Sequence, residues 1–260
     1  YRQITYLCRP MELLIQFAIF AVSIVVLLFS SDRFVESAEK IGLSFGISPF
    51  IIGVTIVAFG TSLPELATSI AAVLGGEPEI VVSNVVGSNI TNIALVLGLS
   101  AVVVKSIDLE THLWFTDIPF FWGSAFMMWF FLSDGAMSVF EAVLSLGGVV
   151  LFLRYSLKDD GTPKEENLPK AGWKAYLFVV LGAAMVSFSA TYIISSITEI
   201  SAQLNIAPKV IALTAVALGT SLPEIAVSLA AARKGKASMA VGNALGSNIF
   251  NTFVEICCAF

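Results

Sequence analysis

Two copies of the hexapeptide GTSLPE each bring a carboxylate into otherwise apolar sequence. They cover residues 60–65 and 219–224, so each ends in a glutamate, Glu65 or Glu224. Hydroxyl side chains accompany each glutamate at spacings that share one helix face: Thr61, Ser62 and Ser69 in the first copy, and Thr220, Ser221 and Ser228 in the second. Carboxylate and hydroxyl oxygens are hard donors, so this pattern indicates a site for Ca2+, Mg2+ or Na+.

A second motif, GSNI, follows each hexapeptide and adds neutral ligands. Around it, amide and hydroxyl side chains recur every fourth position, as Asn84, Ser88 and Asn92 and again as Asn243, Ser247 and Asn251. One Ca2+, or a larger number of Na+ or H+ ions, would balance the charge of two glutamates, so we predict competitive exchange of these cations at one site. The motifs contain no His or Cys, which disfavours Zn2+ and copper, and Mg2+ is disfavoured because it gives up its waters reluctantly.

A proline precedes each glutamate and is expected to break its helix. Pro64 and Pro223 lack an N–H group, and each ring clashes with the carbonyl four residues earlier. We therefore expect freed carbonyl groups around residues 58–61 and 217–220. Inside a membrane, such carbonyls are tolerated only where protein, water or an ion satisfies them, and an ion is the simplest partner here.

The composition places these motifs in a membrane protein. Of the 260 residues, 57% are hydrophobic and 13% charged, and the mean hydropathy is +0.89. A water-facing surface cannot be built from this composition. A net charge of −5 argues against nucleic-acid binding, and three cysteines argue against a disulfide-stapled domain. Apolar runs predict eight membrane spans, at residues 13–30, 49–74, 80–104, 113–132, 136–153, 175–195, 208–232 and 237–260.

An internal repeat organises the chain. A shift of 159 positions aligns residues 53–93 with residues 212–252 without a gap, and about 20 of the 41 aligned positions are identical. Five predicted spans separate the starts of the two copies, so the second copy must cross the membrane in the opposite direction. We predict an all-α polytopic membrane protein with a first inverted repeat at 1–153, a cytosolic loop at 154–174 and an incomplete second repeat at 175–260.

The basic residues predict the orientation of these spans. If the spans alternate, one side of the membrane holds Arg2, Arg9 and Lys209, and the other side holds the remaining 11 of the 14 Lys and Arg residues. Since cytosolic loops carry the excess of basic residues, we expect the N-terminus outside. The turn at residues 75–79 is acidic and the equivalent turn at residues 233–236 is basic, as expected if they face opposite sides.

The doubled motif resembles the alpha repeats of the calcium/cation antiporter superfamily, and is most similar to its prokaryotic sodium/calcium exchanger branch. The resemblance covers about residues 32–99 and 191–253. It implies a central diamond of four ligands at Glu65, Asn92, Glu224 and Asn251. It further implies outer cation sites at the Ala58 carbonyl, Thr61, Ser62 and Ser88, and at Ala217, Thr220, Ser221 and Ser247. In this family, spans 1 and 6 slide over the rest during transport.

Two departures from the family pattern carry further expectations. The family has ten spans, which implies that this chain, with about eight, is a fragment lacking spans 9 and 10. Position 251 is Asn where potassium-dependent exchangers carry Asp, which argues against obligatory potassium transport.

The leading hypothesis is therefore an antiporter in the inner or plasma membrane that exchanges Ca2+ for Na+ by alternating access. Exchange of H+ for Ca2+ or another divalent cation is the alternative within that class. A cation channel is a different class, but conduction favours weak binding at several sites over one central site with two carboxylates. No arrangement typical of an intramembrane hydrolase occurs, so the chain is not expected to be an enzyme. We expect no cofactor, Ca2+, Na+ and lipid as its partners, no nucleic acid, and a functional monomer.

Overall fold

The computed structural model describes residues 2–104, 113–135, 137–157, 170–204 and 219–258, with side chains from residue 11 onward. Helices account for nearly all of these residues, and the described part contains no strand. Five of the described helices are long and apolar enough to cross a membrane: Met11–Ser44, Pro49–Leu74, Glu79–Val104, Val139–Ser156 and Trp173–Gln203. The other predicted spans coincide with shorter helices, and residues 208–218 of the seventh lie outside the described residues.

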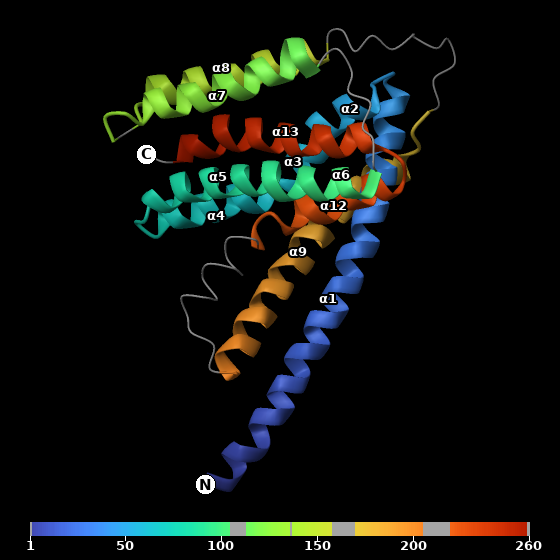
Figure 1. The fold of residues 1–260 in the computed structure, drawn as a ribbon, viewed down its shortest axis with the longest axis vertical. Helices are drawn as coiled ribbons and strands as arrows, with labels where there is room; N and C mark the ends of the chain where they lie inside the picture. The colour runs from blue at the N-terminus through green and yellow to red at the C-terminus, as the bar shows by residue number, and fades with distance from the viewer. Residues whose placement is uncertain (1, 105–112, 136, 158–169, 205–218, 259–260) are drawn as a thin grey trace.

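Helix α1 (Arg2–Ser44) is much longer than the predicted span at residues 13–30. It continues through the charged residues 32–40 that follow the predicted span. At about 1.5 Å per residue it is about 65 Å long, roughly twice the thickness of a bilayer core. It packs along α9 (Trp173–Gln203), and the two helices cross the rest of the bundle obliquely (Figure 1). Phe34 of α1 is fully buried at this interface, against Gly182 of α9.

The second span is a broken helix, as predicted from its proline. It consists of α2 (Pro49–Ile52), the π-helical η1 (Gly53–Val57), α3 (Ala58–Thr61) and α4 (Leu63–Leu74). The third span consists of α5 (Glu79–Thr91), the π-helical η2 (Asn92–Leu97) and α6 (Gly98–Val104). The two π-helical segments were not predicted. Such segments occur mostly as single turns within α-helices, often at functional sites.

Two helical hairpins complete the described fold. The first comprises η3 (Leu113–Asp117), α7 (Ile118–Phe131) and α8 (Val139–Ser156). A capping box between Ser138 and Glu141 fixes the start of α8. The second comprises α12 (Leu222–Arg233), α13 (Ala237–Phe253) and the 3₁₀ helix η5 (Glu255–Cys258).

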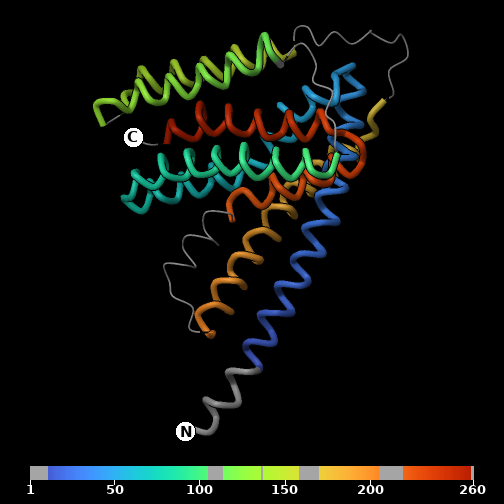
Figure 2. The backbone as a smooth tube through the Cα atoms, viewed as in Figure 1, coloured from blue at the N-terminus to red at the C-terminus, as the bar shows by residue number. Residues whose placement is uncertain are grey.

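The hairpins that carry the repeated motifs run in opposite senses. The turn between α4 and α5 lies at one end of the bundle, and the turn between α12 and α13 lies at the other (Figures 1 and 2). Each turn contains a glycine with positive φ at the same repeat position, Gly76 at 83° and Gly235 at 75°. The inverted-repeat interpretation predicts this arrangement.

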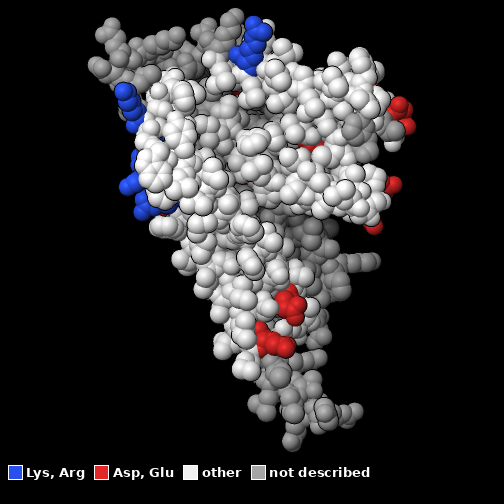
Figure 3. All heavy atoms as spheres, turned by 180° about the vertical axis from the view of Figure 1, so that it is seen from behind, with Lys and Arg blue, Asp and Glu red and all other residues white. Residues whose placement is uncertain are grey.

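Charged side chains of each sign gather in separate places on the surface. In Figure 3, basic side chains lie at the left and top of the main body, acidic side chains lie at its right and on the lower projection, and a broad uncharged surface lies between them. Many large apolar side chains are exposed, among them Trp122, Phe126 and Trp129 of α7. An uncharged belt of this kind suits contact with lipid.

Helix α13 lies at the centre of the described fold, and glycines let it approach the second span closely. It packs against α2, η1, α3, α12 and η2. A Cβ atom at Gly246 would overlap the carbonyl oxygen of Val54, and one at Gly53 would overlap the carbonyl oxygen of Met239. The backbones of the two repeats are therefore in direct contact, which the small residues of the motif favour. No described atom lies within 4 Å of a Cβ at Gly87, so that glycine makes no comparable contact with the described residues.

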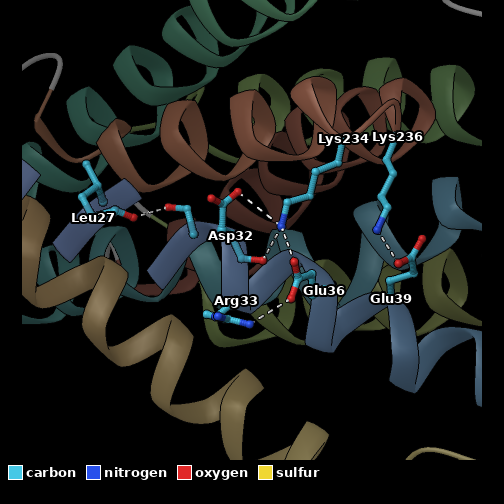
Figure 4. Close-up of polar contacts among 8 residues, drawn as sticks. Leu27, Asp32, Arg33, Glu36, Glu39, Lys234 and Lys236 are labelled. Atoms are coloured by element: carbon cyan, nitrogen blue, oxygen red, sulfur yellow. Dashed lines mark hydrogen bonds and ion pairs between the residues drawn. The ribbon is translucent and has the colours of Figure 1, made fainter. Parts of the chain in front are cut away.

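Ion pairs tie α1 to the turn between α12 and α13 (Figure 4). Lys234 Nζ lies 2.9 Å from Glu36 Oε1 and 3.3 Å from Asp32 Oδ1, and it also donates to the Asp32 carbonyl at 2.9 Å. Lys236 pairs with Glu39. These contacts explain why α1 extends beyond the predicted span, because its acidic residues face basic partners from a distant part of the chain. We call this set of pairs the α1 clasp.

Candidate cation-binding site

The two motif glutamates occupy equivalent places at the starts of half-helices. Glu65 lies in the first turn of α4 and Glu224 in the first turn of α12, each one residue after its proline. The residues at which these half-helices begin have nearly the same conformation, φ −84° and ψ 2° at Ser62 and φ −85° and ψ 4° at Ser221. Both glutamate side chains are fully buried. The positive end of a helix dipole favours a carboxylate in the first turn, which offsets part of the cost of burial.

The two carboxylates face the same interior region but have different partners. Glu224 Oε1 accepts a hydrogen bond from the Ser62 hydroxyl at 3.2 Å, across the boundary between the repeats. Glu224 Oε2 and both carboxylate oxygens of Glu65 have no partner among the described residues. Two ionised carboxylates buried in one region require a positive counter-charge.

Two asparagines, Asn92 and Asn251, add unpartnered amide oxygens to the site. Asn92 donates through Nδ2 to Asn248 Oδ1 at 3.0 Å, and Asn251 donates through Nδ2 to the Ser88 hydroxyl at 3.3 Å. Both asparagines are fully buried, and in each the Oδ1 atom has no partner among the described residues. Because the nitrogen of each amide is engaged, the oxygen is the atom left to bind a ligand.

The hydroxyl groups of the first motif contact the second repeat. Thr61 Oγ1 lies 3.1 Å from Asn243 Oδ1 and 3.4 Å from Ser247 Oγ. Ser221 Oγ is buried and has no partner among the described residues. Thr220 is half-buried, and no described residue bonds to its side chain.

The backbone differs from the prediction at one point. The Ala58 carbonyl is not freed by the break, because it accepts from Ser62 N at 3.0 Å and from Thr61 Oγ1 at 3.3 Å. The carbonyl that loses its usual helical donor to Pro64 is that of Gly60, four residues earlier. The corresponding residue of the second repeat, Ala217, lies outside the described residues.

Other polar residues of the motifs position the site instead of lining it. Asn84 and Asn243 occupy equivalent positions and donate to the backbone carbonyls of Glu65 and Glu224, at 3.4 and 3.5 Å. Asn243 also donates to Ser228 Oγ at 2.9 Å. Asn248 accepts from Asn92 and donates to the Asn89 carbonyl at 3.2 Å. Sequence analysis did not single out Asn248, although its place in both copies of GSNI was a usable signal.

One further buried residue was missed altogether. Glu255 is fully buried, one helical turn beyond Asn251. The position 159 residues earlier is Val96, so a search for doubled residues does not detect it. Among the described residues, no three His, Cys, Asp or Glu side chains gather as a metal centre. The oxygen-rich region therefore contains carboxylates mixed with amides and hydroxyls.

Comparison with known proteins identifies the family. The family model for the sodium/calcium exchanger protein matches residues 15–158 and 174–260. The putative antiporter CaxA of Alkalimonas amylolytica is 38% identical over 241 residues, which cover 88% of this chain and 75% of that protein. The sodium/calcium exchanger MaX1 of Methanosarcina acetivorans is 33% identical over 284 residues, covering 92% and 81% of the two chains.

A solved structure agrees in fold. The sodium-calcium exchanger NCX_Mj, from crystals soaked with Na+ and Sr2+, matches with a TM-score of 0.84 and 34% identity, over 95% of this chain and 82% of that chain. The present chain belongs to the sodium/calcium exchanger family. It is a multi-pass, all-helical membrane protein of the calcium/cation antiporter superfamily, which confirms the predicted fold class and family. Its relatives are transporters and exchangers, consistent with the expectation that it is not an enzyme.

Proposed function

We propose that this antiporter exchanges Ca2+ for Na+ across the membrane at one central site. The observation that supports this proposal best is a set of buried oxygens without hydrogen-bond donors among the described residues: Glu65 Oε1 and Oε2, Glu224 Oε2, Asn92 Oδ1 and Asn251 Oδ1. With both glutamates ionised, all of these oxygens are acceptors and none can satisfy another. A hard cation that takes six to eight oxygen ligands would satisfy them together.

Charge balance suggests how the ions exchange. With Asn at positions 92 and 251, the four central ligands carry only the charges of Glu65 and Glu224. One Ca2+ neutralises both charges, and Na+ ions can do so only in larger number. Each ionic species therefore displaces the other. On either side of the central ligands, hydroxyl groups and the carbonyls of Gly60 and Gly219, each four residues before a proline, would supply ligands for Na+. The hydroxyl groups are those of Thr61, Ser62, Ser88, Thr220, Ser221 and Ser247.

The helix arrangement suggests how access alternates. Both glutamates lie at breaks within spans, and α1 and α9 lie across the remaining helices as one packed pair (Figure 1). Sliding of this pair would open the central ligands to one side and close them to the other. We place the protein in the inner or plasma membrane as a functional monomer, with the N-terminus outside.

The experiment is Ca2+ uptake into proteoliposomes loaded with Na+, Li+, K+ or buffered protons alone. We expect rapid uptake with internal Na+ and little with the others. Uptake driven by a pH gradient without Na+ would establish proton exchange instead. Unitary currents in a planar bilayer would establish a channel.

A further inference from the structure

Glu255 places a third carboxylate in the interior, beside the proposed exchange site. Its side chain is fully buried, in the short 3₁₀ helix that follows α13. Oε1 accepts a hydrogen bond from Asn84 Nδ2 at 2.6 Å and another from the Ser69 hydroxyl. Two donors on one oxygen are the partners expected of an ionised carboxylate. The other oxygen, Oε2, is buried without a partner among the described residues.

No described basic residue neutralises this charge. The ion pairs among the described residues all involve Arg33, Lys234 or Lys236 with acidic residues of α1. An unpaired carboxylate within a span costs roughly 3 kcal/mol on insertion scales. The charge at Glu255 also acts electrostatically on Glu65. No described side chain supplies the positive partner of Glu255, and a bound cation would supply it.

We infer that Glu255, held in place by Ser69 and Asn84, forms through Oε2 an accessory site for one monovalent cation, separate from the central ligands. One carboxylate is balanced by a single positive charge, and its unpartnered oxygen is a hard donor that suits Na+. A divalent ion here would leave an excess charge in a medium of low dielectric. The inference rests on the proposed function, because it assumes that Ca2+ fills the central site.

The repeat provides an internal comparison. Ser228 and Asn243 are the counterparts of Ser69 and Asn84, and they bond to each other at 2.9 Å. The first repeat supplies no carboxylate to this pair, since Val96 of η2 occupies the position equivalent to Glu255. The accessory site therefore belongs to one side of the molecule only, and Ser228 provides a matched control for Ser69.

The test is the number of Na+ ions bound to the purified full chain, measured with radioactive 22Na+ at saturating Ca2+. Wild-type protein should keep about one Na+ that Ca2+ does not displace. Glu255→Gln should lose it, and Ser69→Ala should weaken its binding severalfold, whereas Ser228→Ala should retain it. Glu255→Val, which installs the residue of the first repeat, gives a second variant if Glu255→Gln does not fold, as judged by size-exclusion chromatography.

Several outcomes overturn the inference. They are an absence of Ca2+-resistant Na+ in wild type, its retention in Glu255→Gln and Glu255→Val, or the release of a proton in place of Na+. Failure of the proposed function is seen separately, as an absence of Na+-driven Ca2+ uptake. In that case the wild type should still bind one more Na+ than Glu255→Gln when Ca2+ is omitted, and equal Na+ binding would overturn the accessory site.

Discussion

At the scale of single residues, the central site depends on charge more than on shape. Glutamine has nearly the same size as glutamate and retains one acceptor oxygen, but it removes one of the two charges that balance Ca2+. We expect Glu65→Gln and Glu224→Gln each to reduce Na+-driven Ca2+ uptake by at least about 30-fold, because loss of one buried charged partner costs about 2–5 kcal/mol.

The measurement is initial Ca2+ uptake into Na+-loaded proteoliposomes at matched protein density. Glu79→Gln is the control, since Glu79 is exposed at the start of α5 and should leave uptake unchanged. Near-normal uptake by either central variant would contradict the shared site.

The neutral side chain of Asn251 leaves the central ligands without a third negative charge that K+ could balance. Because its amide is neutral, wild-type uptake should be the same whether K+ or choline accompanies Na+. Asn251→Asp adds a carboxylate one turn before Glu255, and we expect uptake by this variant to be stimulated by K+ as an additional counter-ion. A K+ titration of Ca2+ uptake measures both effects. Wild-type exchange that requires K+ would contradict the argument.

At the scale of elements, the contact between α13 and η1 keeps the two repeats aligned. Gly246→Ala would push α13 away from Val54 and separate Thr61 from Asn243 and Ser247. We expect this overpacking to cost about 1–3 kcal/mol, and to lower both the thermal stability in detergent and the affinity for Ca2+.

The control for this glycine is Gly147→Ala in α8. No described atom lies within 4 Å of a Cβ atom at Gly147, and alanine is the better helix former. Its stability should therefore equal or exceed that of the wild type. An equal loss of stability in both variants would show that close backbone contact is not the cause.

The α1 clasp holds one of the proposed moving helices against the turn between α12 and α13. Lys234→Gln removes its contacts with Asp32 and Glu36, and we expect faster hydrogen exchange in residues 32–39 and 233–237. Partly exposed pairs contribute only about 0.2–1 kcal/mol each, so the change should be a few-fold. The control is Arg33→Gln, because the pair between Arg33 and Glu36 lies within α1. Equal exchange in both variants and wild type would mean that the clasp does not hold α1.

The elements also show how far the sequence could predict this structure. The paired glutamates, their prolines and the broken second span follow from a doubled motif and the stereochemistry of proline. The extension of α1 depends on Lys234 and Lys236, about 200 positions away, and local sequence could not supply these partners. The π-helical η1 and η2 both pack against α13, a contact that local sequence could not supply. Glu255 could not be predicted from the doubled motif, because Val96 occupies its position in the first repeat.

At the scale of the whole molecule, the opposite turns and the divided surface charge define the two ends of the bundle. The clasp joins residues 32–39 of α1 to the basic turn after α12, so these segments lie at the same end. We predict that this end faces the cytosol, because basic residues are retained there.

Labelling from outside tests this orientation. In a protein with Cys8, Cys257 and Cys258 replaced by Ala, a membrane-impermeant maleimide applied to intact cells should label Pro78→Cys and not Lys170→Cys. Permeabilised cells provide the control, since both positions should then react. The reverse pattern would invert the orientation but leave the repeat relationship unchanged.

The pairing of Val96 with Glu255 has a consequence for the resting protein. If two inverted repeats were identical, exchanging their conformations would convert the inward-facing state into the outward-facing state, and the two states would have equal free energies. A charge buried in one repeat and replaced by valine in the other removes that equality. The empty transporter should therefore favour either the inward-facing or the outward-facing state. The Na+ concentration on each side of the membrane would change that preference, because it determines whether Na+ is bound at Glu255.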